Sequence, residues 1–255
     1  MARARHPTLS QYSHFLTPAY HAFFSRLLDA PDDRPNVNHA AISRINLPMM
    51  RMLGLRYLMV DGPIEMPGLT RVARDGRYRL YELADPNLAS FSPTRPHRVA
   101  DARGLLATLA DSGFDPRVDV AIAEEPGITD QLVPATDTTL TFVRGGFRFT
   151  GRSDGHSLVV LPVQYTRCLE LHTVSGSGEG ARALRVNLVQ TGVLFSGDAE
   201  IEGRYRPDGP WERCVRDDVA DVERLRIHDL VERRRLPSYS FPGERFRLFA
   251  PFGLD

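Results

Sequence analysis

An acid, a base and a hydroxyl group lie close together in the stretch Asp154-Gly155-His156-Ser157. These are the side-chain types of a hydrolytic triad, but the members of a triad are brought together from separate segments of a fold. A short polar stretch that contains glycine is more typical of a turn between two strands. We therefore predict a turn here and no catalytic residue.

Other polar motifs in the chain are incomplete as functional sites. The segment Ser175–Gly180 (SGSGEG) is rich in glycine, but it lacks the lysine of a phosphate-binding P-loop and is followed by a strand-like stretch. The eight histidines are scattered, and none has a partner at HxH or HExxH spacing. We predict a hairpin loop at Ser175–Gly180, and we expect no catalytic residue, metal or cofactor.

Four side chains in the second half of the chain are candidates for binding a sugar. Aromatic rings offer a stacking surface, and an amide can hydrogen-bond to hydroxyl groups. The only tryptophan follows a predicted strand, where an aromatic ring can also simply close the core. Both interpretations stay open. The predicted ligand-binding residues are Gln164, Tyr165, Tyr205 and Trp211.

The two cysteines, Cys168 and Cys214, are too far apart in the sequence for a CxxC redox or zinc motif. In a domain that lies outside the cytoplasm, a disulfide between them is expected. Two unrelated buried thiols are the alternative.

The composition is that of a globular domain, with 42% hydrophobic and 25% charged residues in 255. The formal net charge is zero, so the totals show no basic surplus for nucleic acid, and we expect no such partner. All 32 basic residues are arginine, which indicates arginine-rich codon usage or selection for bidentate anion binding. No apolar run approaches the roughly 20 residues of a membrane span. The basic N-terminus lacks the apolar segment of a signal peptide.

The stretch Asn46–Gly62 (NLPMMRMLGLRYLMVDG) combines a helical turn with a strand. Gly54 is placed to end the turn. Leu55–Val60 is an apolar and aromatic run bounded by Asp61 and Gly62, as in a buried strand. The predicted core residues are Met49, Met50, Leu55, Tyr57 and Met59.

Other parts of the first half carry clear local signals. Apolar residues at helical spacing predict a helix at Pro18–Ala30. Asp75-Gly76 between two strand-like runs predicts a hairpin. Asp101 is placed to cap a helix at Ala102–Ser112.

From Leu132 onward, strand-sized runs alternate with glycine, serine and aspartate turns, which is typical of a β-sandwich. A helix is predicted at Asp217–Ile227 and an extended tail at Leu236–Asp255. The predicted fold is α+β and mainly β: an antiparallel, jelly-roll-like β-sandwich preceded by a small α/β segment, with a C-terminal helix and tail. The predicted domains are residues 1–131 and 132–255.

Several segments share their order and residues with a known family. The first are Asn46-Leu47-Pro48 and Leu53–Val60 (LGLRYLMV), followed by a hairpin at Arg77–Leu83, the turn Phe114-Asp115-Pro116-Arg117 and the strand Ser157–Tyr165. The last is Leu184–Pro207 (LRVNLVQTGVLFSGDAEIEGRYRP). From Asn46 to Pro207 this order resembles the C-terminal extracytoplasmic region of YfhO-type bacterial membrane proteins, which are polytopic and glycosyltransferase-like.

The resemblance also has departures. Tyr165-Thr166-Arg167-Cys168 stands where the family has a YPGW turn, and the part after Asp217 has no counterpart. The YfhO-type proteins are glycosyltransferase-like proteins of the GT-C kind. In GT-C enzymes the catalytic acid lies in an early membrane-proximal loop, so the resemblance carries no catalytic residue to this chain.

The resemblance implies a non-catalytic domain on the extracytoplasmic face of the membrane. Such a domain would position or bind a saccharide or lipid-linked sugar, next to the membrane-embedded part of a parent protein. One alternative is a structural or protein-interaction module that uses Leu236–Asp255 for docking. Another is a stand-alone enzyme, which would need a deep pocket with His156 or His172 beside a carboxylate.

Overall fold

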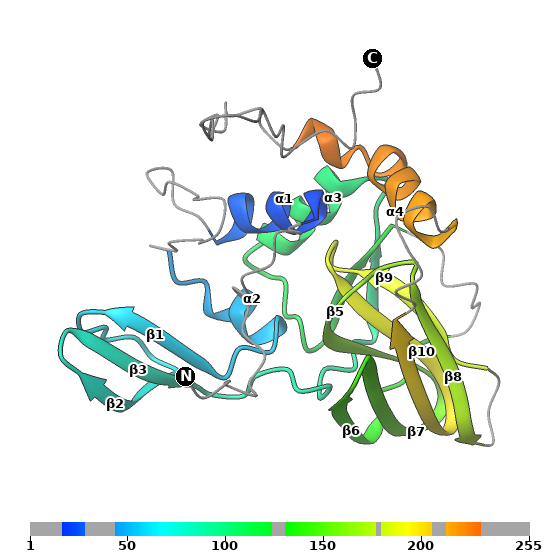
Figure 1. The fold of residues 1–255 in the computed structure, drawn as a ribbon, viewed down its shortest axis with the longest axis horizontal. Helices are drawn as coiled ribbons and strands as arrows, with labels where there is room; N and C mark the ends of the chain where they lie inside the picture. The colour runs from blue at the N-terminus through cyan, green and yellow to red at the C-terminus, as the bar shows by residue number, and fades with distance from the viewer. Residues whose placement is uncertain (1–16, 29–43, 124–130, 177–179, 206–212, 231–255) are drawn as a thin grey trace, which may run out of the picture.

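The computed structural model describes residues 17–28, 44–123, 131–176, 180–205 and 213–230. Within these ranges the chain forms ten strands, four α-helices and one 3-10 helix. The strands make two sheets: a large one and a three-stranded one that projects from the body beside the helices (Figure 1). The predicted α+β, mainly β class is confirmed. Trp211 and the predicted tail Leu236–Asp255 lie outside the described residues.

The large sheet is mixed, with the strand order β4-β5-β9-β10-β7-β6, and β8 also pairs with β10. Only β4 and β5 are parallel, because helix α3 (Ala102–Ala110) crosses between them. This unit corresponds to the predicted α/β segment. The strands are β4 (Arg95–Arg98), β5 (Asp119–Ile122), β6 (Thr136–Val143), β7 (Gly146–Gln164), β8 (Leu169–Gly176), β9 (Arg182–Val186) and β10 (Gln190–Tyr205).

Strands β7 and β10 are unusually long, at 19 and 16 residues, and they pair along nearly their whole length. Their register shifts between Ser196 and Gly197, opposite the extra residues Asp154-Gly155. An extra residue in a ladder bends the strand. The turn predicted at Asp154–Ser157 is therefore wrong, because β7 continues through it as a bulge. Strand β9 pairs with the first part of β10, and β8 pairs with its last part.

The two halves of this bent pair share one apolar cluster. Phe147 and Phe149 from the first half of β7 belong to the same buried cluster as Val159 and Leu161 from its second half. The rings of Phe149 and Phe195 meet edge to face, with centroids 5.6 Å apart. The sandwich-like core is therefore enclosed by one folded sheet whose long strands pass through both layers.

The helices cover a second core. They are α1 (Pro18–Leu27), α2 (Leu47–Met52), α3, α4 (Arg213–Arg224) and the 3-10 helix η1 (Ile227–Asp229). Side-chain caps start three of them: Thr17 for α1, Asn46 for α2 and Asp101, as predicted, for α3. Among the described residues, no helix has the length and apolar character to cross a bilayer.

The helical core draws on both ends of the chain. Phe23 and Met50 pack in the same buried cluster as Leu188 and Ile227. The large sheet likewise takes β4 and β5 from before residue 131 and its other strands from after it. The domain boundary near residue 131 stays a prediction.

A network of buried amides joins the helices to the folded sheet. The Asn87 side chain donates to the carbonyl oxygens of Met52 at 3.2 Å and Val160 at 2.9 Å. Gln190 donates to the same Met52 oxygen at 2.8 Å, and its own Oε1 accepts from Asn187 at 3.1 Å. Asn87, Asn187 and Gln190 are at most 2% exposed. These bonds satisfy polar groups that water cannot reach.

The three-stranded sheet has the order β1-β3-β2, with β1 (Tyr57–Asp61), β2 (Leu69–Asp75) and β3 (Tyr78–Leu83). The predicted hairpin at Asp75-Gly76 is confirmed, with Gly76 at φ +54°.

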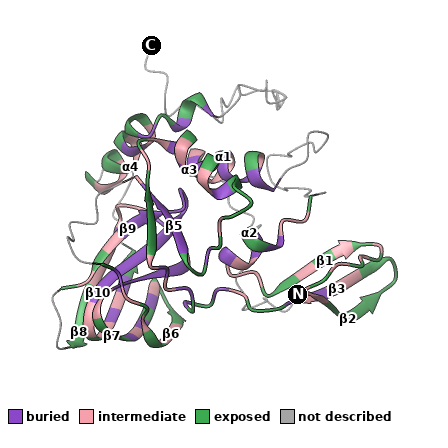
Figure 2. Ribbon diagram, turned by 180° about the vertical axis from the view of Figure 1, so that it is seen from behind, coloured by how far each residue is buried: buried purple, intermediate pink, exposed green. Residues whose placement is uncertain are grey.

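The prediction that β1 is buried is wrong. Met49 and Met50 are buried as expected, but Tyr57 is 48% and Met59 68% exposed. The reason is that this sheet extends away from the body, so β1 and β2 consist of exposed and half-buried residues, whereas β3 contains the buried Tyr81 and Leu83 (Figure 2).

Replacing Asn87 by alanine tests the amide network. The Asn87→Ala variant leaves the Val160 carbonyl without this donor, and the free energy of unfolding is expected to fall by about 2 kcal/mol or more. Urea denaturation followed by circular dichroism measures it. The exposed α3 substitution Arg103→Ala is the control, with a change within about 0.5 kcal/mol. Equal losses in the two variants would contradict a central role for Asn87.

Candidate functional site

The first half of β7 and the last part of β10 alternate between core and solvent. Along β7, the buried Phe147, Phe149 and Gly151 are separated by Arg148, Thr150 and Arg152. The cross-strand partners of these three polar residues on β10 are Glu202, Glu200 and Asp198. Directly opposed residues point to the same face of a sheet. The result is an outer polar face, defined by Arg148, Thr150, Arg152, Asp198, Glu200 and Glu202.

A shallow, open depression of about 380 Å³ lies on this face where β6, β7, β10 and β8 meet. Six of its nine lining residues have polar side chains, whose carbon atoms also contribute to the surface, and the other three are Ala199 and two glycines. Gly176 lets β8 approach β10 closely, since an added Cβ would come within 2.3 Å of the Asp198 carbonyl oxygen. The lining residues are Asp137, Thr150, Gly151, Arg152, Ser175, Gly176, Asp198, Ala199 and Glu200.

The polar groups of the depression are oriented by one another. Arg152 Nε lies 2.7 Å from Asp198 Oδ1, and a second Arg152 nitrogen lies 3.6 Å from Asp137. The hydrogen bond with Asp198 and the charges of Asp198 and Asp137 raise the pKa of Arg152 above its ordinary value. Ser175 Oγ donates to Glu200 at 2.9 Å. The depression therefore offers a fixed guanidinium, carboxylate acceptors and hydroxyl groups side by side.

This arrangement can hold a polar ligand through hydrogen bonds. The carboxylates of the depression are hydrogen-bond acceptors and its guanidinium is a hydrogen-bond donor. Among the described residues, no group of three or more histidine, cysteine, aspartate or glutamate side chains could hold a metal ion.

Three of the predicted ligand-binding residues are described, and none of them lines the depression. Gln164 donates to the Thr17 hydroxyl at 2.8 Å. Tyr165 is 5% exposed, and the Arg185 guanidinium carbon lies 4.5 Å from its ring centroid. Tyr205 is 38% exposed at the end of β10, whereas Gln164 pairs with the first residue of that strand. Ligand binding by these residues stays a prediction.

The histidines named for an enzymatic role do not line the depression either. His172 Nε2 is 3.7 Å from Glu170, and its side chain is about half exposed. The structure instead pairs His97 Nε2 with Asp119 at 2.8 Å, and Arg95 contacts the same carboxylate at 2.8 Å. Burial opposes ionisation of Asp119, but its hydrogen bonds with His97, the Asp115 amide and Arg95 outweigh burial and lower its pKa. This cluster joins the edge strand β4 to β5.

A second polar cluster, the α4 clamp, holds α4 against the sheet. It consists of Arg167 and Arg185 on the sheet side and Asp218 and Asp221 on α4. Arg167 makes two bonds to Asp221, at 2.8 and 3.0 Å, and Arg185 lies 3.2 Å from Asp221 and 3.4 Å from Asp218. Asp221 is the one buried residue within α4. Ion pairs, more than apolar burial, therefore fix this helix.

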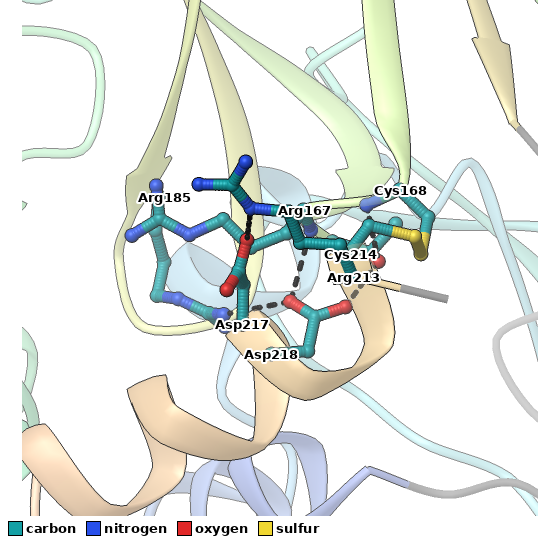
Figure 3. Close-up of a disulfide and its surroundings, with 8 residues drawn as sticks. Arg167, Cys168, Arg185, Arg213, Cys214, Asp217 and Asp218 are labelled. Atoms are coloured by element: carbon teal, nitrogen blue, oxygen red, sulfur yellow. Dashed lines mark hydrogen bonds and ion pairs between the residues drawn. A yellow bond between two sulfur atoms is a disulfide. The ribbon is translucent and has the colours of Figure 1, made fainter. Parts of the chain in front are cut away.

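A disulfide between Cys168 and Cys214 lies beside the clamp, with the two Cα atoms 4.9 Å apart (Figure 3). Arg167 and Asp218 also meet here, because the Arg167 backbone amide donates to Asp218 at 2.9 Å. Thr166 donates its hydroxyl to the same carboxylate. The covalent bond and the clamp thus anchor the start of α4 to the segment between β7 and β8.

Sequence reasoning missed the depression because its residues come from four strands. The available signal was the alternation of charged and hydroxyl residues with Phe147, Phe149 and Gly151, opposite a similar alternation in β10. That pattern predicts a solvent face, but it does not predict where the face is hollowed.

Comparison of the chain with protein-family models, with curated proteins and with solved structures finds no match.

The α4 clamp is expected to make stability depend on acid pH. Burial opposes the charge of Asp221, but its bonds with Arg167 and Arg224 and the charges of Arg167 and Arg185 dominate and lower its pKa from 3.8 to about 2. Because its pKa is lower in the folded than in the unfolded state, Asp221 stabilises the fold above pH 4. This contribution to the free energy of unfolding, about 2 kcal/mol, is lost as the pH falls toward 2. Urea denaturation at pH 6 and pH 2.5 should show a smaller pH-dependent loss for Asp221→Asn than for the wild type. An equal loss of stability between the two pH values in the variant and the wild type would contradict this role of Asp221.

Reduction of the disulfide is expected to lower the free energy of unfolding by about 4 kcal/mol, because the bond closes a loop of 46 residues and so restricts the unfolded chain. The matched control is the double variant Cys168→Ala/Cys214→Ala, which should be equally weakened and should not respond to reductant. Thermal unfolding with and without reductant measures both. A wild type that reductant leaves unchanged would count against a stabilising bond.

Proposed function

We propose that this chain is a non-catalytic, saccharide-binding domain on the extracytoplasmic face of a bacterial membrane, associated with a glycosyltransferase-like protein of the YfhO type. The observation that carries the proposal is the polar depression on the outer face of β6, β7, β10 and β8. The family itself is proposed from the order of segments between Asn46 and Pro207.

The chemistry of the depression matches a sugar. Each sugar hydroxyl can donate one hydrogen bond and accept others. Asp137, Asp198 and Glu200 supply acceptors, and Arg152 supplies donors within the same 380 Å³ space. Small-ligand sites have volumes from roughly 300 Å³ upward. An open depression on a sheet can also receive one unit of a longer glycan, because the chain can continue across the surface on either side.

The extracytoplasmic location is supported by the disulfide. Bonds such as Cys168–Cys214 form and persist in oxidising compartments and are rare in the bacterial cytoplasm. Its position beside α4 gives it a structural role, as expected for a domain that works outside the cell's reducing interior.

Titration with saccharides tests the proposal. We expect fragments of cell-envelope glycans to shift backbone amide NMR signals of β7, β8 and β10, with Arg152→Ala weakening the affinity about tenfold, equivalent to about 1.4 kcal/mol. Because Arg152 is exposed, its removal should leave the fold intact.

Two comparisons sharpen this test. Arg103→Ala, on exposed α3 surface, should bind like the wild type. Tyr205→Ala should also bind normally if the depression is the site. The proposal fails if no glycan fragment shifts the signals, or if Tyr205→Ala removes binding that Arg152→Ala preserves.

A further inference from the structure

Strand β6 forms an open edge of the large sheet. It pairs with β7 on one side, and no described strand pairs with it on the other (Figure 1). Natural sheets usually protect such an edge with charged residues, proline or a very short strand. The opposite edge of this sheet follows the rule, since β4 has four residues and contains Arg95, Pro96 and Arg98. From Thr138 to Val143 (TTLTFV), β6 has neither a charge nor a proline.

The direction of hydrogen bonding along β6 follows from its neighbour β7. The Tyr205 amide donates to the Gly145 carbonyl oxygen at 3.0 Å. Since backbone groups alternate along an antiparallel strand, the odd-numbered residues in the first half of β7 face β10 and the even-numbered ones face β6. The partners of these even-numbered residues on β6 are Thr139, Thr141 and Val143. The backbone groups of Leu140 and Phe142 therefore point to the open edge.

Apolar side chains lie on the core-facing side of this edge. Leu140 is opposite Phe149, and Phe142 is opposite Phe147. Both partners on β7 are fully buried, but Leu140 is only partly buried and Phe142 is 53% exposed. The apolar core of the bent sheet is thus open to solvent at β6. A further strand with apolar side chains at two matching positions would cover it.

We propose that β6 pairs with β6 of a second copy of this chain, antiparallel and about a two-fold axis at Thr141. In this register, Leu140 of each copy forms a hydrogen-bonded pair with Phe142 of the other. The outward-pointing backbone groups are then satisfied, and the two apolar side chains meet twice. Thr141 faces its own counterpart at the axis, in a non-hydrogen-bonded pair. A surface that complements itself in this way is what a two-fold dimer requires.

The pairing closes after two copies, because each copy uses its β6 edge once. A two-fold axis perpendicular to the sheet keeps the outer face of one copy next to the outer face of the other. The two polar depressions would then open on the same side of the joined sheet. The inference goes beyond saccharide binding and does not depend on it.

Disulfide trapping tests the register. In a non-hydrogen-bonded pair the Cα atoms are about 4.5 Å apart, within the range that a disulfide spans. The native cysteines are bonded to each other, so Thr141→Cys adds the one free thiol. We expect mild oxidation to convert this variant to a covalent dimer on a non-reducing gel.

The matched control is Thr139→Cys, which is exposed on the same face of the same strand. In the proposed register position 139 opposes position 143 of the other copy, so the two control thiols are four residues, or about 14 Å, apart along the strands. The control should stay monomeric on the gel. Equal cross-linking of the two variants, or none with Thr141→Cys, would overturn the proposal.

Sedimentation velocity across a concentration series tests the dimer without a cross-link. We expect a reversible monomer–dimer equilibrium for the wild type. Thr141→Glu should raise the dimer dissociation constant about tenfold, because two carboxylates would face each other at the axis. Within one copy the new carboxylate stands opposite Arg148, so the circular dichroism spectrum should be unchanged. An equimolar mixture of Thr141→Glu and Thr141→Lys should dimerise again.

Two results would contradict the dimer. One is a wild type that stays monomeric at every concentration, as expected if β6 receives a peptide from another protein. The other is a dimer that Thr141→Glu leaves unchanged. Because Thr141 does not line the depression, saccharide titration of Thr141→Glu separates failure here from failure of the saccharide proposal.

Discussion

The carbonyl oxygen of Met52 is the point through which the two halves of the molecule are tied. It lies at the end of α2, where a helix leaves carbonyl groups without partners, and it accepts hydrogen bonds from both Asn87 and Gln190. Gln190 begins β10, and Asn87 also bonds to β7 through Val160. One desolvated oxygen therefore sets the position of the helices relative to the bent strand pair. The chain then leaves α2 through Gly54, at φ +77°, whose amide donates to the Arg51 carbonyl oxygen at 2.9 Å.

Polar interactions also hold helix α4. Helix α4 buries a carboxylate, Asp221, between arginines from the sheet side, and its apolar contacts are only partly buried. Breaking a buried pair by removing one partner is costly, because the other charge stays buried and uncompensated. The clamp consequently specifies where α4 sits, and the disulfide next to it limits how far the helix can move if the ion pairs open.

The parts of the fold that sequence reasoning predicted are local. The Asp75-Gly76 hairpin, the Asp101 cap and the helical turn ended by Gly54 each depend on residues adjacent in the chain. The length of β7 was not predicted, because the bulge at Asp154-Gly155 has the same composition as a turn between two strands. Tyr57 and Met59 were predicted to be buried, because an apolar strand on a projecting sheet has the same residue types as a buried strand. The depression depends on register between four strands, and no short stretch of sequence contains it.

The path of the chain between the two cysteines has a consequence for the unfolded protein. The segment from Cys168 to Cys214 includes all of β8, β9 and β10. Strand β10 pairs with both β8 and β9, so the disulfide encloses this strand and two of its partners in one covalent loop. While the bond is intact, the three strands stay near one another even when the chain unfolds, which lowers the entropic cost of pairing them again.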